Sequence, residues 1–419
     1  MFIEFFSSSL LGLWLKTARI AEPPLQLRSA SLHRFALQPA DARRDRLVEA
    51  YLNTLAQQGI VSERQGLWLQ TDSALLVDRQ GQQLQTPASL TKVATTLAAL
   101  KTWGPTHQFK TQIWTTGAVK DGVLAGDLHI QGDGDPLLVT SEAIAIAQQL
   151  NALGIRKVTG QLIVSGAFLF NLDPNLQTAG EQLKAVWNSG TTKSEVEIVG
   201  TVASEITQEN GAEKPLISHA SLPLTDILKM MNVYSNNRIA ETLTDRLGGP
   251  DVLQQIAIET GRVAPQEILL ENGSGLGQDN KLSPRAVVGL FQAIQAELQA
   301  QQLSLGDVFP VMGPDRGTVE ERKMPAATVV KTGTLWNTSG LAGVLQTQRY
   351  GPVWFAVMNS GNDFTDGFRK EQDGFLKRLA QHWGEGVALA QPAGIQRDPV
   401  AVQRLKVIDR LMQDDFWLQ

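Results

Sequence analysis

The spacing of apolar side chains predicts helices on both sides of residues 107–218, with short strands beside them. Apolar positions three or four residues apart indicate amphipathic helices, and short apolar runs between turn residues indicate strands. The predicted helical segments are residues 41–58, 86–100, 224–247 with a break at VYSNN, 282–298, 369–382 and 400–412. The predicted strands are GLWLQ and SALLVD, which read as a hairpin, and near the end ATVVKTGTL, LAGVLQT and PVWFAVM.

Residues 107–218 differ in character from both flanks. FKTQIWT, AVKDGVLAGDLHI and VTGQLIV predict short strands, and SEAIAIAQQLNALG predicts one helix. No element is predicted between residues 171 and 218. We therefore expect a small β-rich domain at 107–218, inserted into a discontinuous domain made of residues 23–106 and 219–419.

The length and composition describe a globular, cysteine-free protein. The 419 residues suggest two or three domains at about 150 residues each. The net charge of −5, without any strongly basic segment, argues against nucleic acid as a partner. Because the chain has no cysteine, thiol catalysis, disulfides and cysteine-ligated zinc are excluded.

The N-terminal segment, residues 1–22, has two open interpretations. Its apolar run is shorter than the ~20 residues that a membrane-spanning helix needs, and it resembles the core of a secretory signal. Glu4 lies where a signal carries positive charge, while Lys16 and Arg19 follow the run instead of preceding it. The other interpretation is an amphipathic N-terminal helix.

The segment TPASLTKVATTLAAL, residues 86–100, places a lysine three positions after a serine. Thr86 is expected to be the N-cap of a helix and Pro87 its first residue. Ser89 would then lie in the first turn, where N–H groups are free, and Lys92 would share its face of the helix. A Ser-x-x-Lys match arises by chance about once in a chain of this size. A solvated lysine at a helix start would explain the match on its own.

Two further short motifs follow in the chain. Ser235-Asn236-Asn237 is a Ser-x-Asn match at the break between two predicted helices, where an ordinary turn would also favour these residues. Lys331-Thr332-Gly333 follows the apolar run ATVV, as a strand end would. Each match is weak alone. Their shared order and structural context match the motif set of penicillin-binding proteins and serine β-lactamases.

Additional sequence boxes narrow this resemblance. The boxes are Gly132-Asp133-Gly134-Asp135-Pro136, Asn272-Gly273-Ser274-Gly275-Leu276, Leu282-Ser283-Pro284, Gly313-Pro314-Asp315-Arg316-Gly317-Thr318 and Leu341-Ala342-Gly343. With these boxes, the chain resembles the low-molecular-weight class C penicillin-binding proteins between about residues 45 and 385. That family comprises D-alanyl-D-alanine carboxypeptidases and endopeptidases of the penicillin-binding-protein-4 type. The resemblance implies a transpeptidase fold of the α/β (α+β) class, in which helices flank an antiparallel sheet.

The chain departs from the family in its middle region. Many members carry a long insert that forms two extra domains between the first two motifs. Here Ser89 and Ser235 are only 146 positions apart, so one inserted domain is expected and the second is expected to be largely absent. The stretch with tryptophan and aspartate that some members place near a diaminopimelate-type side chain has no clear counterpart around 171–195.

The residues support covalent acyl transfer, with Ser89 as the nucleophile and Lys92 as its base. A free lysine has a pKa of ~10.4, so neutrality requires burial or a second cation nearby. The resemblance implies that Lys331 lies beside Lys92 and supplies that cation. It also implies that Ser235 relays a proton to the leaving amine, while Asn237 binds the substrate amide and Lys92.

The resemblance further implies how the peptide is held. Lys331 and Thr332 would bind the C-terminal carboxylate, and Gly333 would let the peptide lie along the strand as an added β-strand. The backbone N–H groups of Ser89 and Thr334 would form the oxyanion hole.

Other candidate sites are weaker. The five histidines lie in no recognisable motif, and no Gly-x-Ser-x-Gly elbow is present. Asp133 and Asp135 lack the twelve-residue loop and distal glutamate of a calcium site. The run of residues 273–277 is not a dinucleotide fingerprint and is expected to be a tight turn near the site. We therefore expect no cofactor and no metal.

The expected function is a serine D-alanyl-D-alanine carboxypeptidase, with endopeptidase action as a further expectation. The partners would be peptidoglycan stem peptides and β-lactams that acylate Ser89, and the location would be the periplasm or another extracytoplasmic part of the cell envelope. A serine β-lactamase is one alternative, although no convincing glutamate box for a deacylating base is found. The other alternative, a non-catalytic wall-binding protein, conflicts with three intact motifs.

Overall fold

The computed structural model describes residues 36–37, 41–189, 196–205, 214–361, 365–386, 404 and 406–410. The N-terminal residues 1–22, for which the sequence left a secretory signal and an amphipathic helix open, lie outside the described residues. Of the helix predicted at 400–412, residues 404 and 406–410 are helical.

A six-stranded sheet forms the centre of the larger part of the chain. Its strand order is β1-β3-β2-β17-β16-β15. The pairs β3–β2, β2–β17, β17–β16 and β16–β15 are antiparallel. The strands are β1 (Ala36–Leu37), β2 (Gln65–Gln70), β3 (Ala74–Arg79), β15 (Val329–Leu335), β16 (Thr338–Thr347) and β17 (Gly351–Ser360). The hairpin and the three late strands are thus confirmed.

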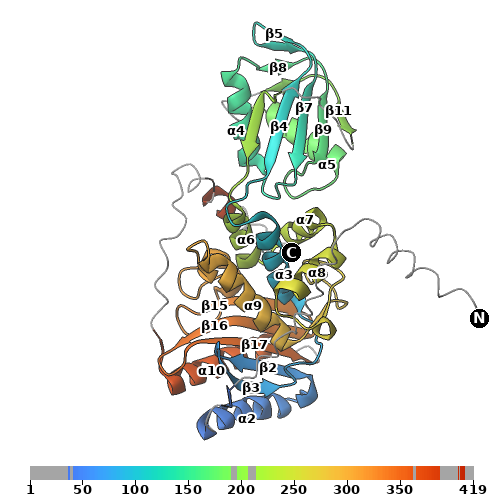
Figure 1. Cartoon of the computed structure of the whole chain (residues 1–419). Coiled ribbons are helices and arrows are strands. Elements are labelled where there is room, and N and C mark those ends of the chain that lie inside the picture. The colour runs from blue at the N-terminus through green and yellow to red at the C-terminus, as the bar shows by residue number, and fades with distance from the viewer. Residues whose placement is uncertain are drawn as a thin grey trace, which may run out of the picture. The chain divides into compact units, whose positions relative to one another are not determined.

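Helices cover both faces of this sheet, as Figure 1 shows. On one face, α9 (Pro284–Gln299) packs on β2 and β17, and α3 (Thr91–Trp103) packs on α9. On the other face lie α10 (Thr365–Trp383) and α2 (Ala42–Ala56). Strand β16 is buried along all ten residues, because both of its faces are covered.

A group of shorter helices follows in the chain and packs around α3. These helices are α6 (Leu224–Val233), α7 (Asn237–Leu247) and α8 (Pro250–Thr260). The break between α6 and α7 falls at VYSNN, as predicted. After α8 comes a short antiparallel pair of strands, β13 (Ile268–Leu269) and β14 (Lys281–Leu282).

The start of α3 differs from the prediction. The helix begins at Thr91, and a 3-10 turn, η2 (Ala88–Leu90), precedes it. Thr86 is therefore not the N-cap, and Pro87 is not the first α-helical residue. Ala88 adopts a positive φ of 49°, which an α-helical start does not allow. The backbone turns sharply just before the nucleophile candidate and only then enters the helix.

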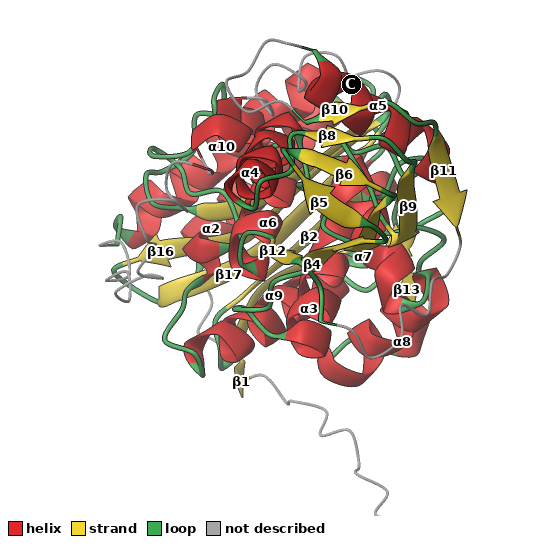
Figure 2. Cartoon of the chain, turned by 90° about the horizontal axis from the view of Figure 1, so that it is seen from above, coloured by secondary structure: helices red, strands yellow, loops and turns green. Residues whose placement is uncertain are grey.

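The middle of the chain forms two further sheets, which Figures 1 and 2 show from two directions. The five-stranded sheet has the order β11-β9-β7-β4-β12, and the four-stranded sheet has the order β10-β8-β6-β5. The strands of the first are β4 (Lys110–Thr115), β7 (Leu128–Asp133), β9 (Leu162–Ala167), β11 (Val202–Glu205) and β12 (Ile217–Ala220). Those of the second are β5 (Ala118–Lys120), β6 (Val123–Ala125), β8 (Lys157–Val158) and β10 (Glu197–Ile198).

Two helices complete this region: α5 (Leu176–Asn188) packs on β9, β10 and β11, and α4 (Thr140–Ala152) packs on α5. Helix α5 occupies part of the region where the sequence predicted no element. One hydrophobic core extends from Ile113 to Ile217 and is separate from the core around the six-stranded sheet. The proposed domain boundaries at 106/107 and 218/219 stay a prediction.

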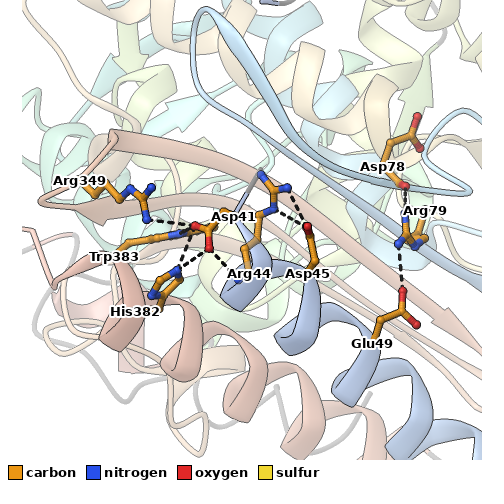
Figure 3. Close-up of polar contacts among 9 residues, drawn as sticks. All are labelled: Asp41, Arg44, Asp45, Glu49, Asp78, Arg79, Arg349, His382 and Trp383. Carbon is orange, nitrogen blue, oxygen red and sulfur yellow. Dashed lines mark hydrogen bonds and ion pairs between the residues drawn. The ribbon is translucent and has the colours of Figure 1, made fainter. Parts of the chain in front are cut away.

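A buried carboxylate, Asp41, fastens the outer helices to the sheet (Figure 3). It caps the N-terminus of α2 by accepting the Arg44 N–H, and it also accepts from His382 Nε2 at 2.9 Å. Arg349 and Trp383 donate to the same carboxylate. Burial alone would raise the pKa of Asp41, but the hydrogen bonds from Arg44, His382 and Trp383 outweigh it and lower the pKa below its ordinary value.

Candidate active site

The 3-10 turn Ala88–Leu90, called the serine turn below, packs against β15, the end strand of the six-stranded sheet. A Cβ atom on Gly333 would lie 2.7 Å from Pro87 O and 3.1 Å from Ser89 N. A Cβ atom on Gly340, the cross-strand partner of Gly333, would lie 2.7 Å from Leu90 Cδ1. Only glycine allows this approach at both positions. Gly333 is therefore required for the close packing of the serine turn on β15. The sequence analysis had explained this glycine differently, by a substrate peptide that lies along the strand.

Lys92 is fully buried and makes three polar contacts. Its Nζ lies 2.9 Å from Ser89 Oγ, 2.7 Å from Asn237 Oδ1 and 2.8 Å from Ser274 O. Burial lowers the pKa of Lys92 well below its ordinary value, and the charge of Lys331 lowers it further. The nearby charge of Glu241 acts in the opposite direction. The neutral amine is thus favoured beside a hydroxyl group.

The geometry around Lys92 determines where its lone pair points. A neutral amine has two N–H groups and one lone pair. The oxygens of Asn237 and Ser274 can only accept, so they take both N–H groups. The remaining contact, to Ser89 Oγ, must then use the lone pair as acceptor and the serine hydroxyl as donor. In its neutral form, Lys92 is aimed at the proton of Ser89.

Ser235 lies at the break between α6 and α7 and faces the second lysine. It has a positive φ of 54°, a strained conformation for a residue other than glycine. Lys331 Nζ donates to Ser235 Oγ at 3.0 Å and to Thr332 O at 2.8 Å. Lys331 is fully buried, and burial lowers its pKa to about 7. The structure thus brings together the candidate residues of all three motifs.

An arginine that the sequence analysis did not identify lies beside the outer end of β15. Arg369, on α10, donates from Nη2 to Thr334 Oγ1 at 3.1 Å. Thr334 is exposed, whereas Thr332 is buried. No motif marks Arg369, since it lies on a helix well beyond the Lys-Thr-Gly box. A guanidinium here supplies positive charge at the rim of the site.

The turn at residues 273–277 is near the site, as predicted, and takes a direct part through the Ser274 carbonyl. The other candidates are used elsewhere. Asp133 forms an ion pair with Arg246, and Asp135 accepts the Leu137 N–H. Within the described residues, no group of three or more His, Cys, Asp or Glu side chains is arranged to hold a metal ion.

Comparison with known proteins identifies the family. The family model described as the D-Ala-D-Ala carboxypeptidase 3 (S13) family matches residues 49–171 and 167–381. The chain belongs to the D-Ala-D-Ala carboxypeptidase 3 (S13) family. This membership confirms the prediction of a serine-type D-Ala-D-Ala carboxypeptidase.

One curated protein is similar to this chain in sequence, and two solved structures are similar to it in fold. A D-alanyl-D-alanine carboxypeptidase of Haemophilus influenzae is 22% identical over 68% of this chain and 83% of its own length. Penicillin-binding protein 4 of the same organism, solved with a β-lactam, has a TM-score of 0.65 at 20% identity, over 80% of this chain and 99% of that one. A predatory peptidoglycan endopeptidase of Bdellovibrio bacteriovorus has a TM-score of 0.63 at 21% identity, over 77% of this chain and 94% of that one.

The structural likenesses confirm the predicted fold class. In addition, no helix in the described part of the chain is long and apolar enough to cross a membrane.

Proposed function

We propose that Ser89 is the nucleophile of this carboxypeptidase and that Lys92 is its general base. Lys92 Nζ takes the hydroxyl proton while Ser89 Oγ attacks the carbonyl carbon of the D-Ala-D-Ala peptide bond. The tetrahedral intermediate collapses with cleavage of the C–N bond, and the terminal D-alanine leaves after its amine gains a proton through Ser235. Water then hydrolyses the ester on Ser89 and regenerates the enzyme.

The observation that carries this proposal is the arrangement of acceptors around Lys92. Two oxygens that cannot donate lie 2.7 and 2.8 Å from its Nζ, and the Ser89 hydroxyl lies 2.9 Å away. A solvated surface lysine would have neither the full burial nor the lowered pKa that Lys92 has. A positioned general base contributes about 10²–10⁴-fold in rate.

The substrate would be held along β15. Lys331 and Thr332 would bind the C-terminal carboxylate of the peptide, and Arg369 would add charge through its contact with Thr334. The N–H groups of Ser89 and Thr334 would form the oxyanion hole, in which each donor is worth about 3 kcal/mol. Gly333 serves this hole by letting the serine turn approach the strand.

The partners and the location follow from the substrate. Peptidoglycan stem peptides and β-lactams are the proposed ligands, since a Bdellovibrio bacteriovorus endopeptidase of the same fold has been solved acylated by penicillin G. Endopeptidase action is proposed on the same analogy. Such substrates place the enzyme in the periplasm or another extracytoplasmic part of the cell envelope.

Penicillin labelling tests the proposal at the level of a single residue. Trypsin should release residues 80–92, QGQQLQTPASLTK, in which Ser89 is the only serine. We expect the penicilloyl adduct on this peptide and no adduct in Ser89→Ala, together with loss of D-alanine release from a stem-peptide mimic. An adduct elsewhere, or equal D-alanine release by both proteins, would remove Ser89 from this role.

The same labelling experiment separates the two alternatives. Rapid hydrolysis of the adduct would indicate a β-lactamase, and its persistence indicates a penicillin-binding enzyme. The absence of both labelling and D-alanine release would leave a non-catalytic wall-binding protein.

A further inference from the structure

We infer that Glu241 is a positioning residue that holds the carbonyl of Ser274 against Lys92 and so keeps the lone pair of that amine on Ser89. This inference rests on the proposed roles of Ser89 and Lys92. Glu241 lies in none of the three motifs and does not touch the nucleophile.

Glu241 clamps the backbone of the 273–274 turn from helix α7. Its carboxylate accepts the Gly273 N–H at 3.1 Å and the Ser274 N–H at 3.0 Å. It lies four residues after Asn237, so the two side chains share one face of α7. One helix therefore presents one acceptor to Lys92 directly and fixes the other acceptor through the turn.

Other contacts besides the Glu241 clamp also restrict the 273–274 turn. Thr95 Oγ1 on α3 donates to Gly273 O at 2.7 Å. A Cβ atom on Gly273 would lie 1.8 Å from Thr244 Oγ1, so the turn packs directly on α7. With the N–H groups of Gly273 and Ser274 held by Glu241 and the Gly273 carbonyl held by Thr95, the Ser274 carbonyl is directed toward Lys92, 2.8 Å away.

Loss of the clamp should misdirect the base. If the Ser274 carbonyl swings away, Lys92 keeps only Asn237 as a fixed acceptor. One of its N–H groups can then turn toward Ser89, and the lone pair is no longer held on the hydroxyl proton. The rate of Ser89 acylation falls even though every atom of the three motifs is present.

The charge of Glu241 has a second, separable effect. It favours the protonated form of Lys92, in opposition to burial and Lys331. Removing the charge should therefore lower the pKa of Lys92 and move the rising limb of the pH–rate profile to lower pH. Removing the clamp should instead lower the maximum of that profile.

Two variants of Glu241 and one control separate these effects. Glu241→Gln removes the charge and replaces one acceptor oxygen by a donor NH₂ group, which cannot accept the second backbone N–H. Glu241→Asp keeps the charge but retracts the carboxylate by one methylene. Asp245→Asn, one turn further along α7, removes an exposed charge close to Glu241 and leaves both hydrogen bonds of the Glu241 clamp in place.

The measurement is the second-order rate constant for acylation by a fluorescent penicillin between pH 5 and 10, normalised to sites titrated with excess penicillin. We expect the maximum rate constant of the profile to fall about 10- to 100-fold in Glu241→Gln, within the contribution of a positioned base, with the rising limb at lower pH. Glu241→Asp should lower the maximum and leave the position of the rising limb unchanged. Asp245→Asn should keep the wild-type maximum.

Wild-type rate constants per titrated site in both Glu241 variants would overturn the inference. This holds even if fewer sites can be titrated, because a residue that only supports the fold would lower the number of active sites and not the rate at each site. Failure of wild-type Ser89 to be acylated would instead overturn the proposed function, so the two failures are distinguishable.

Discussion

The backbone nitrogen of Ser89 lies 3.1 Å from the point that a Cβ atom of Gly333 would occupy. The substitution Gly333→Ala should therefore push the serine turn away from β15 and spoil the oxyanion hole. We expect penicillin acylation to fall by at least about tenfold, since one oxyanion donor is worth 10²–10³-fold in related chemistry. Stopped-flow acylation measures the loss.

The matched control is Gly374→Ala in the middle of α10. There a Cβ atom would meet only the tip of the Arg378 side chain, at 3.2 Å, and alanine stabilises a helix by about 1 kcal/mol over glycine. Acylation should be unchanged in this variant. A wild-type rate of acylation in Gly333→Ala would contradict the prediction and show that the serine turn tolerates displacement.

Removing the amine of Lys92 should abolish acylation without removing the protein's fold. Lys92→Met keeps a long unbranched side chain in the buried position but provides no base. We expect acylation by penicillin to fall about 10²–10⁴-fold, as measured by the time course of adduct formation. Circular dichroism and the midpoint of thermal unfolding show whether the variant is folded. Acylation within a few-fold of wild type would assign the base to another group.

The two buried lysines should give a bell-shaped pH dependence of kcat/KM. Lys92 must be neutral, and its lowered pKa places the rising limb well below the ordinary range of a lysine. Lys331 must be protonated to bind the substrate carboxylate, and its pKa of about 7 places the falling limb there. Both limbs belong to the coupled pair. D-alanine release from a stem-peptide mimic between pH 4 and 10 tests the shape, and a flat profile from pH 8 to 10 would contradict the role of Lys331.

Arg369 should affect substrate binding more than chemistry. Replacing it with alanine removes the guanidinium beside Thr334 while the three motifs stay intact. Because Arg369 is partly exposed, we expect a loss of about 0.2–1 kcal/mol, which corresponds to a rise in KM of about 1.4- to fivefold at nearly constant kcat. Lys370→Ala, the exposed neighbour on α10, is the matched control. Equal KM values for all three proteins would exclude Arg369 from carboxylate binding.

Asp41 should stabilise the fold in a pH-dependent manner. Asp41→Ala removes the N-cap of α2 and the acceptor of His382, which should lower the free energy of unfolding by about 0.5–2 kcal/mol or more. Because the pKa of Asp41 is lower in the folded protein than in the unfolded chain, its stabilisation is complete above pH ~4 and is lost as the pH falls further. Urea unfolding at pH 7 and pH 3 measures both effects. Asp45→Ala, at an exposed position of the same helix, should change little.

The sequence predicted the parts of the fold that have strong periodicity. The helices around Ser89 and Ser235, the hairpin of β2 and β3 and the three late strands follow from apolar spacing and turn residues. The 3-10 turn at Ala88–Leu90 could not be predicted, because the packing of β15 and β16 on the turn overrides the local preference of Thr86 and Pro87 for a helix start. Helix α5 was missed, although its buried residues Ala179, Leu183 and Trp187 have the spacing of a helix in the sequence.

The three motifs predicted which of their own residues lie close together. The residues that surround them, such as Glu241 and Arg369, could be identified only in the structure. Glu241 is an ordinary helical glutamate in the sequence, and its contact with Ser274 depends on how α7 packs on a turn more than thirty residues away. Arg369 reaches Thr334 only because α10 returns to the sheet after β17. Contacts of this kind arise from tertiary packing and leave no local pattern in the chain.

Strand β17 pairs with β2 on one side and β16 on the other, and the Tyr51 hydroxyl on α2 donates to Asn359, 308 positions later. The central sheet therefore cannot close until almost the whole chain has left the ribosome. During synthesis, the serine turn has no completed sheet to rest on. A chain that stops before β17 therefore lacks the strand that joins the β15–β16 hairpin, on which the serine turn packs, to the N-terminal strands β2 and β3.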